Sequence, residues 1–134
     1  MSARADSHHV SEGGKGLVFV VDDHQLLGEI TEGLLQAAGY GTRLFSDPLL
    51  ARDALLCADP PPHALVTDYD LGPLKGLDLI AVARSVSPTM KCVLVSGTAD
   101  PELLLRLPVK ADQFIAKPFN GTHLVGTVDR LLGA

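Results

Sequence analysis

Short apolar runs alternate with amphipathic stretches along most of the chain, and polar residues follow the ends of these runs. The runs are LVFVV at 17–21, ALVT at 64–67, CVLV at 92–95 and QFIA at 113–116. A further short strand is expected at Gly41–Phe45, between the first two runs. Short runs rich in Val, Leu and Ile are typical of parallel strands that helices cover on both faces. The pattern therefore predicts five strands, most of them deeply buried.

The segments between the runs have helical periodicity and recognisable ends. The first helix is expected from Gln25 to Ala38, with Gly39 as its stop. The second is expected to begin at Pro48, with Ser46 or Asp47 as its cap, and to end near Ala58. The other expected helices are Leu77–Val86, Pro101–Leu107 and Thr122–Leu132. Five successive strand–helix units predict an α/β fold.

The composition fits one domain with a substantial core. The chain has 134 residues, of which 46% are apolar, with a net charge of −5 and a mean hydropathy of +0.23. The acidic balance argues against sequence-independent binding to nucleic acid. Residues 1–16 are polar and glycine-rich, so we expect a disordered N-terminal arm before a domain at 17–134.

Other features predict a cytoplasmic protein without a membrane partner. No stretch approaches the roughly 18 consecutive apolar residues that a membrane span requires, and the N-terminus lacks an apolar signal segment. Cys57 and Cys92 have neither disulfide-motif nor zinc-ligand spacing, so we expect two reduced, partly buried thiols.

The polar residues that follow the strands have complementary chemistry. Asp22 and Asp23 follow the first strand, Asp68 the third, Ser96 the fourth and Lys117 the fifth. The carboxyl ends of parallel strands open onto one edge of a sheet, so these residues are expected to meet. Converging carboxylates need a neutralising cation, and a hard oxygen site suits Mg²⁺. The sequence therefore predicts a site for a metal ion and a phosphoryl group.

Each of these residues also has an ordinary structural role when it is considered alone. An acidic pair such as Asp22 and Asp23 commonly caps a helix, and Ser96 begins a small, turn-like stretch. A single lysine after a strand, such as Lys117, is most often a solvated charge. The functional interpretation depends on their combination.

In combination these motifs resemble a known family. An Asp pair follows the first strand, Asp68 precedes a Leu-Gly-Pro-x-x-Gly loop, and Ser-Gly-Thr-Ala and Lys-Pro-Phe follow the last two strands. This arrangement resembles the receiver domain of bacterial two-component response regulators over about residues 16–134. The resemblance implies a (βα)5 doubly wound, flavodoxin-like fold, with a five-stranded parallel sheet in the order 2-1-3-4-5, similar to stand-alone chemotaxis regulators.

The resemblance also implies a role for each acidic residue. Asp68 would be the phosphoacceptor and would also contact Mg²⁺. Asp23 would bind the ion directly, Asp22 would act through water, and the backbone carbonyl of Asp70 would complete the protein ligands. Many relatives have Asn, Arg or Met at the position of Asp70, and its extra negative charge is expected to affect the lifetime of the phosphate.

The remaining positions carry over in the same way. Lys117 would contact the Asp68 carboxylate and then the phosphoryl group, while Ser96 would move toward the phosphate. Phe114 occupies the family's aromatic switch position, although filling the core explains it equally well. The bond from Lys117 to Pro118 is often cis in this family.

The function implied is that of a single-domain response regulator. It would accept a phosphoryl group from a phosphohistidine on a histidine kinase or histidine phosphotransfer protein, in a Mg²⁺-dependent reaction. The domain would catalyse its own phosphorylation and dephosphorylation without acting as an enzyme on another substrate. Because little chain follows Lys117, output is expected through protein contact or a phosphorelay to an unidentified protein, without binding to nucleic acid.

Two alternatives remain. Asp68 and Asp70 also resemble the nucleophile and acid–base pair of haloacid-dehalogenase-type phosphatases, but in that family the nucleophile strand opens the domain and the acidic pair comes last. A phosphorylation-independent adaptor is the second alternative, and it is disfavoured because no site residue is missing.

Overall fold

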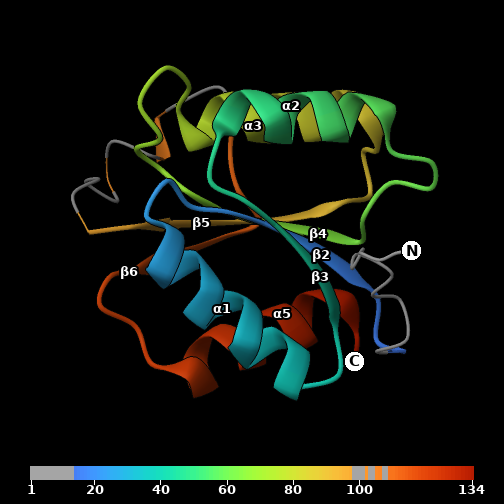
Figure 1. The fold of residues 1–134 in the computed structure, drawn as a ribbon, viewed down its shortest axis with the longest axis vertical. Coiled ribbons are helices and arrows are strands. Elements are labelled where there is room, and N and C mark those ends of the chain that lie inside the picture. The colour runs from blue at the N-terminus through green and yellow to red at the C-terminus, as the bar shows by residue number, and fades with distance from the viewer. Residues whose placement is uncertain (1–13, 98–101, 103–104, 107–108) are drawn as a thin grey trace.

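One sheet of five parallel strands forms the centre of the molecule (Figure 1). The computed structural model describes residues 14–97, 102, 105–106 and 109–134. The spatial order is β3-β2-β4-β5-β6, which is 2-1-3-4-5 when the strands are counted along the chain, so the predicted topology is confirmed. The strands are β2 (Leu17–Val21), β3 (Gly41–Phe45), β4 (Ala64–Asp68), β5 (Lys91–Ser96) and β6 (Gln113–Ala116).

Helices cover both faces of the sheet. Figure 1 shows α1 (Gln25–Ala37) and α5 (Gly121–Leu132) on one face, and α2 (Pro48–Cys57) and α3 (Gly76–Val86) on the other. Every observed strand and helix end lies within one residue of its predicted position. The short helix expected from Pro101 to Leu107 falls mostly on residues outside the described part of the chain.

Local capping explains where the helices begin and end. The Asp47 carboxylate accepts a hydrogen bond from the backbone N–H of Leu49 at 2.9 Å, so Asp47 is the cap of α2 rather than Ser46. Pro48 follows it in the first turn of the helix, a position that the fixed φ of proline suits. Gly39 has a φ of 105°, which stops α1 and turns the chain into β3.

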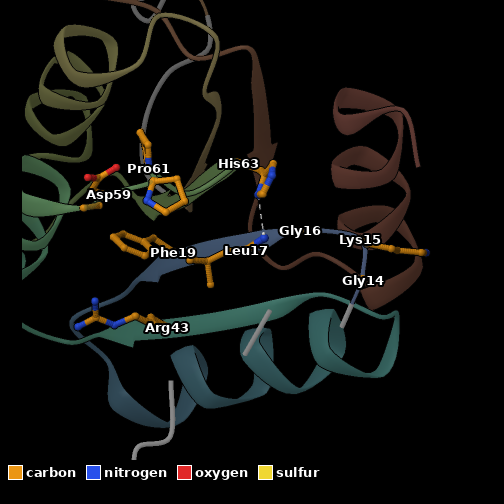
Figure 2. Close-up of a pocket in the computed structure, with 11 residues that line it drawn as sticks. Gly14, Lys15, Gly16, Leu17, Phe19, Arg43, Asp59, Pro61 and His63 are labelled. Atoms are coloured by element: carbon orange, nitrogen blue, oxygen red, sulfur yellow. Dashed lines mark hydrogen bonds between the residues drawn. The ribbon is translucent and has the colours of Figure 1, made fainter. Parts of the chain in front are cut away.

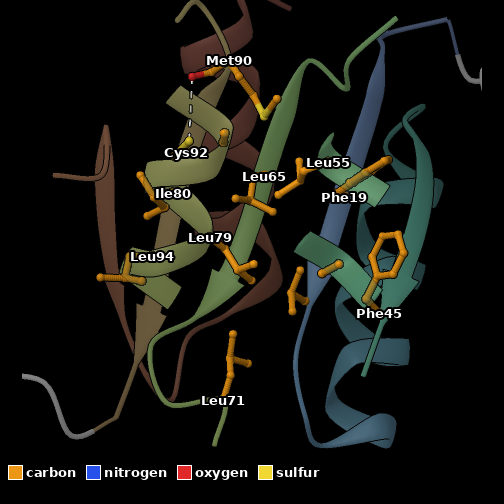
Figure 3. Close-up of a cluster of buried hydrophobic side chains, with 13 residues drawn as sticks. Phe19, Phe45, Leu55, Leu65, Leu71, Leu79, Ile80, Met90, Cys92 and Leu94 are labelled. Carbon is orange, nitrogen blue, oxygen red and sulfur yellow. Dashed lines mark hydrogen bonds between the residues drawn. The ribbon is translucent and has the colours of Figure 1, made fainter. Parts of the chain in front are cut away.

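Alternate residues of each central strand contribute to two cores. Phe19 and Val21 of β2 pack in the core beneath α2 and α3, which Figure 3 shows. Val18 and Val20 face the other core, beneath α1 and α5. Because both faces are buried, the strand has an apolar run without a polar alternation. The sheet is therefore a rigid support for the residues at its edges.

Lys15 and Gly16, at the end of the expected N-terminal arm, are hydrogen-bonded to residues around the start of β3. The Lys15 N–H donates to the Gly39 carbonyl at 3.3 Å, and the Gly16 carbonyl accepts from the Gly41 N–H at 2.9 Å. Residues 1–13 of the expected arm lie outside the described part of the chain.

Both cysteines are free, but Cys57 is exposed and Cys92 is buried, so the prediction of two partly buried thiols was wrong. Among the described helices, none has the length and apolarity that crossing a bilayer demands.

Candidate functional site

The predicted site residues lie at the carboxyl edge of the sheet, held there by backbone hydrogen bonds between strands. The register pairs Asp68 with Val95 and Ser96 with Ala116. Just beyond the strands, Lys117 N–H donates to the Ser96 carbonyl at 2.9 Å. The polar ends of β4, β5 and β6 are thus adjacent because the strands are parallel and in register.

Three carboxylates converge at this edge. Asp22, Asp23 and Asp68 each offer one oxygen, and these oxygens lie within 4.8 Å of one another. Asp22 is buried, Asp68 is partly buried and Asp23 is exposed. The Asp22 carboxylate accepts a hydrogen bond from His24 N–H at 2.9 Å through Oδ1, which fixes it at the start of α1. Hard oxygen donors at this spacing, open on the exposed side, fit a Mg²⁺ ion that retains some of its waters.

Lys117 supplies positive charge to the same cluster. Its Nζ lies 3.1 Å from Asp68 Oδ1 and 3.8 Å from Asp22 Oδ2, and its peptide bond to Pro118 is cis. Three carboxylates and one ammonium leave two negative charges uncompensated when all are ionised. A divalent cation matches this excess, which supports the fit to Mg²⁺.

The electrostatics of the cluster act on Asp68 in opposite directions. Burial raises the pKa of the Asp68 carboxyl above its ordinary value, and the nearby charges of Asp22 and Asp23 raise it further. The hydrogen bond and the charge of Lys117 lower it, but they do not overcome the other causes. Without a metal ion, the surroundings of Asp68 therefore disfavour its ionised form.

Ser96 and Phe114 also occupy defined positions. Ser96 ends β5 and is buried, with 3% of its surface exposed. Phe114 is partly buried and packs against the core beneath α2 and α3. Its contact with the core agrees with the packing role, and its role as a switch remains a prediction.

The loop after Asp68 contains two residues, Lys75 and Gly76, whose roles in shaping the site do not follow from the sequence pattern. A Cβ atom on Gly76 would lie 2.2 Å from the carbonyl oxygen of Asp68, so only glycine permits α3 to begin this close to the site. The side chain of Lys75, the cap residue of α3, forms an ion pair with Asp70 at 2.9 Å. Gly76 was visible as part of the Leu-Gly-Pro-x-x-Gly motif, whereas no sequence signal identified the ion pair between Lys75 and Asp70.

A separate cavity of about 740 Å³ lies at the amino ends of the strands (Figure 2). Its lining includes Phe19, Arg43 and His63, and His63 Nδ1 accepts a hydrogen bond from Leu17 N–H at 3.0 Å. The Arg43 guanidinium packs over the Phe19 ring. None of the converging carboxylates lines this cavity, so it is distinct from the site at the carboxyl edge.

Curated relatives of the chain are response regulators. It is 30% identical over 111 residues to the DNA-binding response regulator MtrA of Mycolicibacterium paratuberculosis, covering 83% of this chain and 48% of that protein. It is 26% identical over 116 residues to the transcriptional regulatory protein FixJ of Bradyrhizobium diazoefficiens, covering 86% and 56%. The chain therefore spans about half the length of the curated relatives it matches.

Solved structures and a family model agree with this result. A receiver domain protein (CheY-like) from Methanospirillum hungatei is 25% identical, with a TM-score of 0.75 and coverage of 87% of this chain and 93% of that one. A receiver domain protein from Clostridium thermocellum, at 18% identity, has a TM-score of 0.80 with coverage of 87% and 94%, and it shows the fold alone. The model of the response regulator receiver domain matches residues 18–129. The chain therefore belongs to the response regulator receiver domain family of two-component systems.

Proposed function

We propose that the domain accepts a phosphoryl group from a phosphohistidine onto Asp68 in a Mg²⁺-dependent reaction. The observation that carries this proposal is the contact of the Asp68 carboxylate with Lys117 at 3.1 Å, beside two further carboxylates. A nucleophilic carboxylate, a fixed ammonium and a metal-binding oxygen cluster are the groups that phosphoryl transfer requires.

The residues divide the chemistry among them. An Asp68 oxygen attacks phosphorus in line, and the bond from phosphorus to the histidine nitrogen breaks. The Lys117 ammonium neutralises charge on the transferring group, and the Ser96 hydroxyl donates a hydrogen bond to a phosphoryl oxygen. Asp22, Asp23, Asp68 and the backbone carbonyl of Asp70 would hold the metal ion. When bound, Mg²⁺ supplies positive charge against the phosphoryl oxygens.

An apolar surface beside the site suits a protein as the phosphoryl donor. Leu26, Leu27 and Ile30 of α1 are exposed to 59%, 41% and 52%. A cavity of about 550 Å³ joins this surface to the site, because Asp22 and Lys117 also line it. Exposed apolar patches mark interaction sites. We propose that the donor, a histidine kinase or histidine phosphotransfer protein, contacts this surface.

Output through contact with another protein, or through a phosphorelay, is part of the same proposal. The net charge of −5 supports a protein target over direct contact with nucleic acid. DNA binding appears in the name of the MtrA relative, of which this chain spans 48%. A domain of this kind modifies itself. Each chain is therefore expected to take up one phosphoryl group and later to lose it by hydrolysis.

Incubation with acetyl phosphate, with and without Mg²⁺, tests the proposal. Intact-mass measurement should show one acid-labile phosphoryl group that appears only with Mg²⁺. Repeated release of phosphate from an organic monoester, such as para-nitrophenyl phosphate, would instead indicate the phosphatase chemistry suggested by Asp68 and Asp70. Absence of labelling would favour a phosphorylation-independent adaptor.

A matched variant separates docking from chemistry. Leu27→Ser should slow transfer from a phosphorylated protein donor, because Leu27 is an exposed apolar residue of this surface and is not one of the residues to which the chemistry is assigned. Labelling by acetyl phosphate should be unchanged, since the small donor needs no docking surface. Equal loss with both donors would contradict the assignment of this surface to the protein donor.

A further inference from the structure

One side of α2 carries two opposite charges with a leucine at each end. Leu49 is followed at three, four and seven positions by Arg52, Asp53 and Leu56, so the four side chains share one side of the helix. Both leucines are exposed, as are 41% of the Arg52 side chain and 60% of the Asp53 side chain. The buried side of α2 is formed by other residues, namely Pro48, Ala51 and Leu55. All four side chains are therefore accessible to another molecule.

Each central charge keeps a group that is not used within the chain. Arg52 Nε and Nη2 both donate to Asp53 Oδ1, each at 3.3 Å. Within the described part of the chain, neither Arg52 Nη1 nor Asp53 Oδ2 has a hydrogen-bond or ion-pair partner. A carboxylate can accept from more than one donor. The helix therefore presents one donor and one acceptor for a second pair of opposite charges.

Two copies of α2 that pack antiparallel make these groups complementary. A two-fold axis between positions 52 and 53 places Arg52 of each copy opposite Asp53 of the other, and Leu49 opposite Leu56. Helices in contact lie about 8 to 10 Å apart, a distance that an arginine and an aspartate side chain together can span. An axis centred on Asp53 would oppose two carboxylates, and an axis centred on Arg52 would oppose two guanidinium groups. The charges thus favour a single register.

We propose that this side of α2 is the contact between two copies of the chain. Figure 1 shows α2 on the face of the sheet opposite α1 and α5, so the contact leaves the apolar surface of α1 uncovered. Because α2 begins just after the carboxyl end of β3, antiparallel pairing directs the carboxyl edges of the two copies in opposite directions. The contact needs no phosphoryl group, and both copies stay open to a phosphoryl donor.

The contact is small, because α2 has ten residues and is about 15 Å long. Four side chains from each copy bury less than the roughly 800 Å² per partner of a standard interface, so the dimer is weak and forms only at high concentration. At the micromolar concentrations used for labelling, the chain is then a monomer.

Symmetry doubles the effect of a charge reversal. Each reversed charge replaces two attractions across the axis by two repulsions. An exposed pair favours association by a factor of about 1.4 to 5, and a like-charge pair opposes it by a similar factor. One reversal should therefore weaken dimerisation by a factor between about 4 and several hundred.

Cys57 distinguishes this arrangement from an oxidation product. Its thiol is exposed at the end of α2. In the antiparallel pair, the two copies of Cys57 lie about 13 Å apart along the helix axis, whereas a disulfide needs Cα atoms within about 7 Å. A reducing agent should therefore leave the association unchanged.

Sedimentation equilibrium of the full chain, with reductant and at concentrations up to about 1 mM, measures the association. Arg52→Asp and Asp53→Arg should each weaken it by the factor given above. Mixed in equal amounts, these two variants should associate like the parent chain, because two aspartates then face two arginines. The double variant that carries both substitutions should also dimerise like the parent. Arg130→Asp is the matched control, because Arg130 is an exposed arginine on α5, on the opposite face of the sheet.

A parent chain that stays monomeric at about 1 mM would overturn the inference. Reversals that leave association unchanged, a mixture that fails to restore it, or a dimer that is lost on reduction would do the same. An equal effect of Arg130→Asp would show that net charge or another surface controls association, and would also refute the contact through α2. Restoration in the mixture requires both variants to be folded, so misfolding cannot mimic the expected result. Labelling by acetyl phosphate does not depend on the contact, so this inference and the proposed function can each fail without the other.

Discussion

Replacing Asp68 by Asn should stabilise the metal-free protein, although it removes the ion pair with Lys117. Burial and the neighbouring carboxylates raise the pKa of Asp68 in the folded state. A carboxyl with a raised folded pKa binds its proton more tightly in the native than in the unfolded chain. Stability therefore falls as pH rises from the unfolded pKa, about 3.9, through the raised folded value. At neutral pH this stability is already lost, and an uncharged side chain recovers it.

The distances give the size of the effect. Two carboxylates with oxygens within 4.8 Å of Asp68 each repel it by about 3.5 kcal/mol at an effective dielectric constant of roughly 20. Lys117 at 3.1 Å attracts it by about 5 kcal/mol on the same scale. The net repulsion is about 2 kcal/mol, and screening by salt reduces it. We expect Asp68→Asn to raise the free energy of unfolding by about 1 to 2 kcal/mol and the Tm by about 3 to 8 °C.

Thermal unfolding with a chelator and then with Mg²⁺ measures this effect. Mg²⁺ should raise the Tm of the parent chain more than that of Asp68→Asn, because the variant has lost one oxygen anion of the cluster. Asp53→Asn is the matched control, since Asp53 is an exposed carboxylate on α2 that forms an ion pair with Arg52. A metal-free Asp68→Asn protein that melts at or below the parent temperature would refute the reasoning.

The other predictions concern the metal, the loop and the fold. Asp23→Ala should weaken Mg²⁺ binding more than Asp22→Ala, measured by titration followed by NMR, because Asp23 is the expected direct ligand. Gly76→Ala should destabilise the fold by about 2 to 3 kcal/mol in denaturant unfolding and slow labelling by acetyl phosphate, because the added Cβ displaces the phosphoacceptor backbone. Tyr40→Phe should cost about 1 kcal/mol, because Tyr40 O–H donates to Asp129 and lowers its pKa. This stabilisation is present above the unfolded pKa of the aspartate and is lost as pH falls through its lowered folded pKa. The free energy of unfolding of the variant should therefore fall less steeply than that of the parent chain as the pH is lowered in the acid range.

Controls and contrary outcomes differ among these three. For Mg²⁺, unchanged affinity in both aspartate variants would count against the acidic site. Gly126→Ala controls for Gly76→Ala, because a Cβ at Gly126 meets nothing within 4 Å; equal effects would show that close packing is not the cause. For Tyr40→Phe, an acid limb as steep as that of the parent chain would show that the hydrogen bond to Asp129 is not linked to pH.

The strands and the site could be predicted from sequence because both depend on simple constraints. Strands buried on two faces leave uninterrupted apolar runs, as Val18 to Val21 illustrate with side chains in both cores. Parallel strands deliver their last residues to one edge, which explains why Asp68 and Lys117 meet although 49 positions separate them in the chain.

The loop geometry could not be predicted in the same way. The pairing of Lys75 with Asp70 depends on the path of the chain between them, which includes a turn at Gly72 with a φ of 86°. Periodicity carries no information about such a path, and either side chain alone is an ordinary exposed charge. The exposure of Cys57 at the end of α2 was missed for a similar reason, because a helix end can turn a residue outward.

The central claim is that Asp68 itself carries the phosphoryl group, and locating the modification tests it most directly. The chain is labelled with acetyl phosphate and Mg²⁺, reduced with borohydride to convert an acyl phosphate to homoserine, and digested for peptide mass spectrometry. The account predicts conversion at Asp68, no conversion in Asp68→Asn, and normal conversion in Asp53→Asn. Conversion at another carboxylate, or undiminished labelling of Asp68→Asn, would contradict it.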